Sequence, residues 1–111
     1  MSEIKQNKPY GEVEIEDHAG KVGGRKNLRE INVKVDDIEY YYLVKKPGRK
    51  EVQAIATATE KKDLNQVQKL TLGCVLEGDK EAYENDAAIY LQLMEQIGSL
   101  VQSATSSIKK L

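Results

Sequence analysis

The longest hydrophobic pattern in the chain runs from Asp86 to Leu111. Apolar side chains recur there at alternating steps of four and three residues, which is the spacing of one face of an α-helix. The members of this row are Tyr90, Met94, Ile97, Val101, Ala104, Ile108 and Leu111, with Leu93 and Leu100 beside it. The apolar face is wider than the stripe of a strict coiled coil. The pattern predicts a long amphipathic C-terminal helix, covered by the rest of the domain or by a partner.

A strictly alternating pattern in the middle of the chain predicts a β-hairpin whose two-residue turn is Asp36-Asp37. This turn puts three opposed pairs of apolar residues on the same face of the sheet. The opposed apolar pairs are then Val35–Ile38, Val33–Tyr40 and Ile31–Tyr42. Lys34 and Glu39 form an opposite-charge pair on the other face. Asp-Asp is a poorer turn sequence than Asn-Gly, but register, burial and charge all favour this pairing.

Three further segments have helical patterns. The segment 12–22 fits either a strand or a short helix, and Gly23-Gly24 after it favours the helix. A helix is predicted over about 49–60, and a second one from an Asp63 cap to Gly78, including Cys74, Val75 and Leu76. Asp79 is expected to cap a short turn, and Asn85 or Asp86 to cap the last helix. The prediction is a flexible or partly helical arm over residues 1–27, followed over 28–111 by a single α+β domain in which an N-terminal hairpin packs on three helices.

Composition limits the kind of protein this is. The core must be aliphatic, because the chain has six Tyr but no Phe or Trp. Charged residues make up 32% of the chain and the net charge is −1, which gives no broad attraction to nucleic acid or to an acidic membrane. The single cysteine, Cys74, suits a reducing compartment. Neither a secretory signal nor a membrane-spanning run is seen. We expect a cytoplasmic protein.

No set of residues has the spacing of a catalytic or metal site. His18 is the only histidine, and metal sites require several ligands at defined spacing. Cys74 has no predicted base nearby and fits a small buried hydrophobe. The segment 20–26 fails the spacing of a phosphate-binding loop, and 79–90 fails that of a calcium loop. We therefore expect no enzyme activity, no cofactor, no metal and no small-molecule ligand.

Two surfaces are candidates for binding a macromolecule. The first is the apolar face of the last helix, with the candidate partner-binding residues Tyr90, Leu93, Met94, Ile97, Leu100 and Val101. The second is a basic loop made of Lys45, Lys46, Arg49 and Lys50. Basic side chains next to tyrosines are able to hold single-stranded nucleic acid. The hairpin uses Tyr40 and Tyr42, however, which leaves Tyr41, and the balanced charge favours a solvated loop.

Three stretches between residues 42 and 111 carry a resemblance to a known family: YLVKKPGRKEVQAI, KLTLGCVLEGD and the closing segment that ends in KKL. With these stretches the chain resembles the small tail assembly chaperone-like proteins of bacteriophages and prophages, so we expect it in the host cytoplasm if a phage encodes it. The matching positions are Lys45, Pro47 and Arg49 between a strand and a helix, then Cys74, Gly78 and Asp79, on which a second helix closes before the amphipathic C-terminal helix. Residues 1–30 match nothing in this family.

The resemblance implies a protein that is not an enzyme. Proteins of this family bind the long, aggregation-prone tape measure protein and help tail tube subunits gather on it. We therefore expect a helical, tape-measure-like partner. A small tail or head-joining subunit that associates with itself is the alternative, and a nucleic-acid-binding module is the less favoured one.

Overall fold

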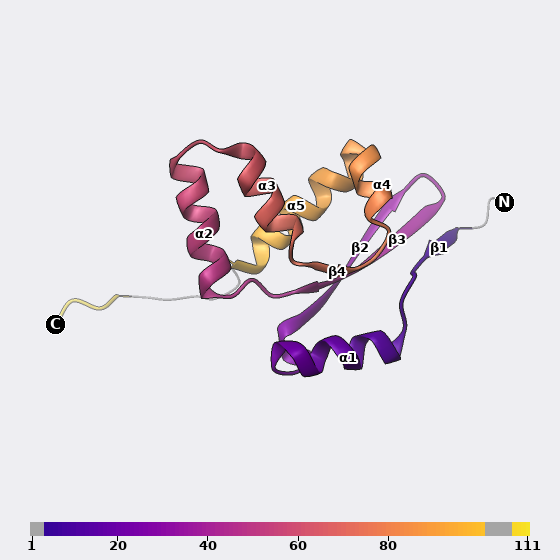
Figure 1. The fold of residues 1–111 in the computed structure, drawn as a ribbon, viewed down its shortest axis with the longest axis horizontal. Coiled ribbons are helices and arrows are strands. Elements are labelled where there is room, and N and C mark those ends of the chain that lie inside the picture. The colour runs from indigo at the N-terminus through magenta and orange to yellow at the C-terminus, as the bar shows by residue number, and fades with distance from the viewer. Residues whose placement is uncertain (1–3, 102–107) are drawn as a thin grey trace.

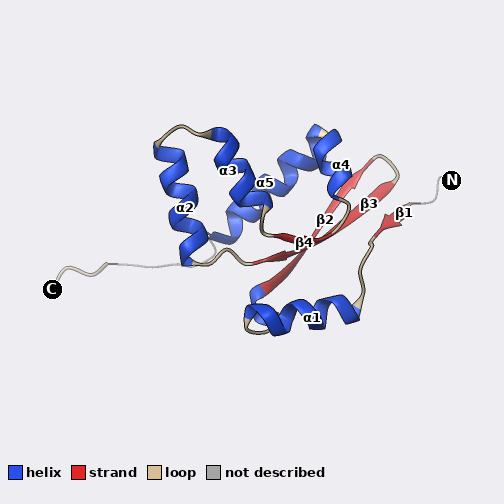
Figure 2. Cartoon of the chain, in the orientation of Figure 1, coloured by secondary structure: helices blue, strands red, loops and turns tan. Residues whose placement is uncertain are grey.

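A four-stranded sheet lies between one helix on one side and a group of helices on the other (Figures 1 and 2). The structure is a computed structural model that describes residues 4–101 and 108–111. Its elements in chain order are β1 (Lys5–Asn7), α1 (Glu12–Val22), the 3-10 helix η1 (Arg25–Asn27), β2 (Leu28–Val35), β3 (Ile38–Lys45), α2 (Arg49–Glu60), α3 (Leu64–Leu72), β4 (Val75–Glu77), α4 (Lys80–Asn85) and α5 (Ala87–Val101). The α+β class predicted from the sequence is confirmed.

The hairpin β2–β3 has the register that the alternating pattern predicts. Its pairs include Val35–Ile38, Val33–Tyr40, Ile31–Tyr42 and, on the other face, Lys34–Glu39. Asp36 in the turn adopts a left-handed conformation with φ 55°. Aspartate is one of the few residues besides glycine that occupy this region readily, because its short polar side chain bonds to the nearby backbone. An Asp-Asp turn is therefore compatible with the hairpin.

The arrangement around the hairpin differs from the predicted one. The hairpin is not N-terminal, because β1 precedes it and pairs in parallel with the first half of β3. Further along the same edge, β4 pairs with Leu43 and Val44 of β3. The prediction that the second helix continues to Gly78 is wrong. The helix α3 ends at Leu72, and the chain turns at Gly73 so that Val75 and Leu76 complete the open edge of β3.

The two faces of the sheet belong to two hydrophobic clusters. Alternate residues of the hairpin, such as Val33 and Tyr42, face α4 and α5, and the cluster also contains Cys74 and Val75. The other face presents Leu28 and Leu43 to the helix α1, together with Tyr10 and Ala19. The period of two along a strand places successive side chains in different layers. In Figure 1, α1 lies below the sheet and the other helices lie above it.

Residues 5–27 are part of the packed structure. Tyr10 is buried, and its hydroxyl donates a hydrogen bond of 2.7 Å to a carboxylate oxygen of Glu30 in β2. Asn7 donates a bond of 2.8 Å to Asp79, far along the sequence. The expected short helix is present as α1, and it ends at Gly23 in a left-handed conformation. These contacts join the segment before β2 to the sheet and to α4.

Aspartates begin the last three helices. Asp63 and Asp79 accept hydrogen bonds from the backbone N–H groups of Gln66 and Ala82, as predicted. Asp86 accepts a bond from Ala88 at the start of α5. The last helix is described over Ala87–Val101, and the predicted helix does not extend to Leu111, because 108–111 are not helical. Ala104, another member of the predicted row, lies outside the described residues.

We expect a methyl group at Gly78 to destabilise the protein and one at Gly20 to stabilise it. Gly78 has φ 136°, and an added Cβ would overlap the Tyr42 ring and lie 3.0 Å from the Tyr41 carbonyl oxygen. Gly78→Ala should cost about 2 kcal/mol or more, through backbone strain and this overlap. Gly20 lies in α1 with open space around it, so Gly20→Ala should gain up to about 1 kcal/mol. Urea unfolding of both variants checks these signs, and equal effects would contradict the structure.

Stability should fall at alkaline pH. Burial raises the pKa values of Tyr10, Tyr42 and Cys74, and the Glu30 carboxylate adds to the shift at Tyr10. The unfolded chain therefore loses these protons first, from about pH 8.5 for the thiol and about pH 10 for the phenols, and the free energy of unfolding decreases above those values. Urea unfolding between pH 7 and 11 should show this decrease, and Tyr42→Phe should reduce the slope above pH 10. A flat profile would show that these groups ionise equally in both states.

Candidate partner-binding surface

One row of apolar side chains on α5 is buried in the core. Ile89, Leu93 and Ile97, each four residues from the next, are at most 1% exposed and pack against the apolar residues of the hairpin. Leu100 is half-buried and packs against the same cluster. Leu93 and Ile97, both predicted as partner contacts, are therefore enclosed side chains in this structure. The row facing the sheet starts at Ile89 rather than at Tyr90, so the helix is rotated relative to the predicted face.

A second apolar row runs beside the buried one and is open to solvent. It contains Ala87, Tyr90, Leu91, Met94, Gly98 and Val101, and we call it the α5 flank. Leu91 is 61% exposed and Val101 42%, while Tyr90 and Met94 are half-buried. The other flank of α5 is polar, with Gln92, Gln96 and Ser99. The helix therefore carries more apolar surface than its own domain covers.

Sequence reasoning missed Leu91 as a surface residue. The signal was present in the spacing of Ala87, Leu91, Met94 and Gly98, which follow one another at steps of four and three. Of the predicted contacts, Tyr90, Met94 and Val101 belong to this flank. Two apolar rows on one helix share the same period, so the sequence pattern alone does not show which row faces the sheet.

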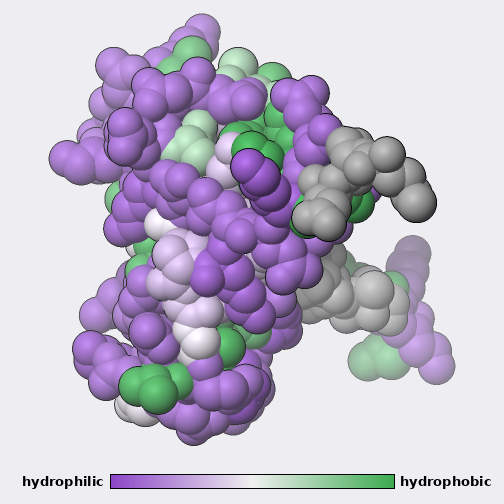
Figure 3. Space-filling model, turned by 90° about the vertical axis from the view of Figure 1, so that its right-hand side faces the viewer, coloured by the Kyte–Doolittle hydropathy of each residue, from purple (hydrophilic) through white to green (hydrophobic). Residues whose placement is uncertain are grey.

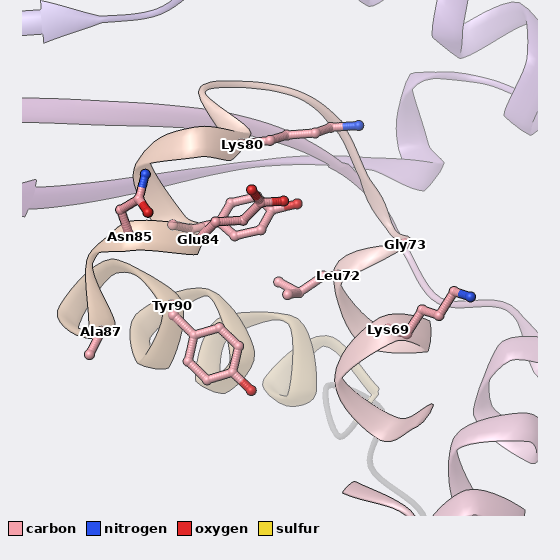
Figure 4. A pocket seen from close by; sticks show the side chains of 9 residues that line it. Lys69, Leu72, Gly73, Lys80, Glu84, Asn85, Ala87 and Tyr90 are labelled. Carbon is pink, nitrogen blue, oxygen red and sulfur yellow. The ribbon is translucent and has the colours of Figure 1, made fainter. Parts of the chain in front are cut away.

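A cavity of about 680 Å³ adjoins the start of the α5 flank. It lies between the end of α3, the helix α4 and the first turn of α5 (Figure 4). Its lining residues are Lys69, Leu72, Gly73, Lys80, Tyr83, Glu84, Asn85, Ala87 and Tyr90. Ala87 and Tyr90 belong to both the cavity and the flank, so the two form one continuous surface.

The wall of the cavity is anchored in the core. Tyr83 is buried, and its ring lies 6.0 Å from that of Tyr42 at an angle of 54°. Burial and the nearby Glu84 carboxylate raise the pKa of Tyr83. In Figure 4, Leu72 lies between the α4 side chains and Tyr90, and the ammonium groups of Lys69 and Lys80 extend to the side away from Asn85 and Ala87.

Apolar residues also gather at the end of the molecule seen in Figure 3. They lie near the top of that view, at the height of α4 and the start of α5, and hydrophilic residues cover most of the remaining face.

One of the four basic residues of the loop is paired with a carboxylate, so only part of the predicted positive charge is available. Lys45 donates a hydrogen bond of 2.8 Å to Glu51, which raises the pKa of Lys45 and lowers that of Glu51. Backbone N–H groups at the start of α2 also favour the Glu51 carboxylate. The pair is therefore charged and mutually neutralised at neutral pH. Lys46, Arg49 and Lys50 remain as the exposed cations of the loop.

The ring of Tyr41 is not open for stacking on a nucleic-acid base beside this loop. Its hydroxyl donates a bond of 2.9 Å to Glu39, and the ammonium group of Lys8 lies 5.4 Å from the centre of its ring. Tyr42 is completely buried. A site for single-stranded nucleic acid needs open aromatic faces next to the cations, and the structure does not bring the two together here.

The remaining candidates for a catalytic or metal-binding role, His18 and Cys74, are held by contacts within the fold. His18 lies 2.9 Å from a carboxylate oxygen of Glu77 and so connects α1 to β4. Cys74 is fully buried, and burial raises the pKa of its thiol. Within residues 4–101 and 108–111, no group of three or more acidic, histidine or cysteine side chains is arranged to hold a metal ion. No helix in that part of the chain is long and apolar enough to cross a membrane.

Comparison with known proteins defines the fold but no family. No protein-family profile and no curated protein matches the chain. One similar solved structure is that of the uncharacterised protein rbstp2171 from Bacillus stearothermophilus, with a TM-score of 0.56 and 15% sequence identity. The similarity covers 86% of this chain and 98% of the other. At this level of identity it shows a shared fold alone.

The two rows of α5 should respond differently to the same substitution. Leu93→Ala removes a side chain with no exposed surface and should cost about 2–5 kcal/mol of unfolding free energy. Leu91→Ala, on the same helix, should change stability by less than about 0.5 kcal/mol because Leu91 is 61% exposed. Urea unfolding measures both values. A large loss in Leu91→Ala would show that the α5 flank is needed for folding.

Proposed function

We propose that this protein is a non-enzymatic binding protein that holds a helical segment of a partner on the α5 flank. The observation that carries this proposal is the second apolar row of α5, exposed beside a row that already fills the core. Apolar side chains at helical spacing next to a cavity are the usual receptor for an amphipathic helix. Contiguous exposed apolar patches larger than a few hundred Å² often mark protein interaction sites.

The nature of the partner comes from the resemblance to phage tail assembly chaperone-like proteins. Under this proposal, the partner is a tape measure protein, whose long helices expose apolar faces before the tail tube covers them. The protein keeps such a segment from aggregating by covering one of its faces. The positions that carry the resemblance, such as Pro47, Gly78 and Asp79, have structural roles here as turns and a helix cap, so they support the fold rather than a binding site.

Self-association through the α5 flank is the second candidate function. The same exposed row would bury itself against a second copy, as in a small tail or head-joining subunit. Light scattering over a range of concentrations separates the two, because a strict monomer excludes this function. Binding of nucleic acid through Lys46, Arg49 and Lys50 is less favoured, since Lys45 is paired and the neighbouring tyrosines are engaged.

Co-expression with a tape measure protein from the same genome tests the leading proposal. The wild-type chain should keep the partner in the soluble fraction. Leu91→Glu with Met94→Glu should weaken binding by about tenfold or more, since each loss of 1.4 kcal/mol is tenfold in affinity. Both side chains lie on the α5 flank.

The matched control is Gln92→Glu with Gln96→Glu, which adds the same charges to the polar flank of the same helix and should leave binding unchanged. Leu93→Glu is unsuitable as a probe, because it would bury a charge in the core. If the partner is equally insoluble with and without this protein, the proposal fails.

A further inference from the structure

The cavity between α3, α4 and α5 is lined by two lysines, although the stretch of chain around it is mainly acidic. Between residues 63 and 101, Lys69 and Lys80 are the only basic residues. The acidic residues of the same stretch are Asp63, Glu77, Asp79, Glu81, Glu84, Asp86 and Glu95. Both lysines nevertheless line this one cavity, one from the end of α3 and the other from the start of α4. The stretch 63–101 therefore has both of its basic side chains at a single place.

Neither lysine is neutralised by a neighbouring carboxylate. Both side chains are exposed, and no ion pair joins either of them to another described residue. Lys45, by contrast, is held by Glu51 at 2.8 Å. Lys69 and Lys80 are thus available to an anionic group that approaches the cavity.

The floor between the lysines is apolar. Leu72 and Tyr90 are half-buried there and Tyr83 is buried. The cavity therefore has apolar lining residues with the two lysines beside them. In Figure 4 both ammonium groups extend to one side and Asn85 lies at the other, while Glu84 reaches from α4 toward the middle. A bound segment with carboxylates at one edge would therefore be held in one orientation.

We propose that this cavity is the docking site for an acidic amphipathic helix of a partner protein. One apolar side chain of that helix enters beside Leu72 and Tyr90, and carboxylates within a turn of it pair with Lys69 and Lys80. The rest of its apolar face continues along the α5 flank, with which the cavity shares Ala87 and Tyr90. This inference rests on the proposed function and adds the charge that the partner must carry.

Two synthetic peptides test the charge preference without the natural partner. The first is a fluorescein-labelled helical peptide of about 18 residues, or about five turns, with leucines along one face and glutamates on both sides of them. Its twin has lysine in place of every glutamate. Fluorescence anisotropy measures both dissociation constants at low salt. The acidic peptide should bind about fivefold more tightly, which is the effect of two exposed ion pairs, and added salt should reduce the difference.

The expected preference is opposite to that of non-specific attraction. The surrounding stretch has an excess of acidic residues, so general electrostatics would favour the lysine peptide. Lys69→Glu with Lys80→Glu should invert the preference. The matched control, Lys26→Glu with Lys61→Glu, makes the same charge change at exposed lysines outside the cavity and should leave the acidic peptide preferred. Circular dichroism confirms that each variant is folded.

Four results would overturn this inference. The first three are tighter binding of the lysine peptide, equal binding of both peptides, and binding of neither. The fourth is an unchanged preference in the variant with Lys69→Glu and Lys80→Glu. These results leave the proposed function open to its own test, because the tape measure protein could still depend on Leu91 and Met94. Conversely, a tape measure protein that stays insoluble would reject the proposed function, even where the acidic peptide is preferred.

Discussion

Tyr42 is the side chain on which the packing of the helices against the sheet depends. It has no exposed surface, and its hydroxyl donates a hydrogen bond of 2.7 Å to the carbonyl oxygen of Asp79. Its ring packs near Tyr83 of α4 and leaves no room for a Cβ at Gly78. A buried phenol is stable only when its hydroxyl has a partner, so this bond sets where the β4–α4 connection passes over the sheet. The position of α4, and with it one wall of the cavity, follows from this contact.

The same packing explains why α5 has two apolar rows with different roles. The row of Ile89, Leu93 and Ile97 closes the core over β2 and β3. Once it is in place, the sheet has no surface left for the adjacent row, and the cavity beside α3 and α4 adjoins that row at Ala87 and Tyr90. Leu91 and Val101 therefore stay in solvent because the geometry of one helix on one sheet allows a single row to be buried. Their exposure is a consequence of the architecture, and a partner gains apolar contact there without disturbing the core.

Local patterns predicted the hairpin and the helix starts because the responsible interactions lie close together in the sequence. The alternation around Asp36-Asp37 defines both the register and the buried face, and Asp63, Asp79 and Asp86 cap helices through bonds to residues two or three positions on. Predictions failed where distant partners decide. Val75 and Leu76 fit a helical face equally well, but the unpaired edge of β3 draws them into a strand. Asn7 and Tyr10 fall in the predicted arm, and their contacts are with distant residues, such as the strand β3, Glu30 and Asp79.

The sequence also predicted only part of the candidate site, because the periodic pattern of one helix is local and the packing that completes the site is not. Periodicity identified α5 as a helix with a wide apolar face, but it did not separate Leu93 and Ile97, which the core encloses, from the residues that stay exposed, because that boundary is set by the sheet. Lys69 and Lys80 stand eleven residues apart in sequence, and their shared cavity exists only because α3 ends at Leu72 and the chain returns through β4. The turn at Gly73 therefore has two effects. It adds a strand to the sheet, and it brings two isolated cations together beside the open row of α5.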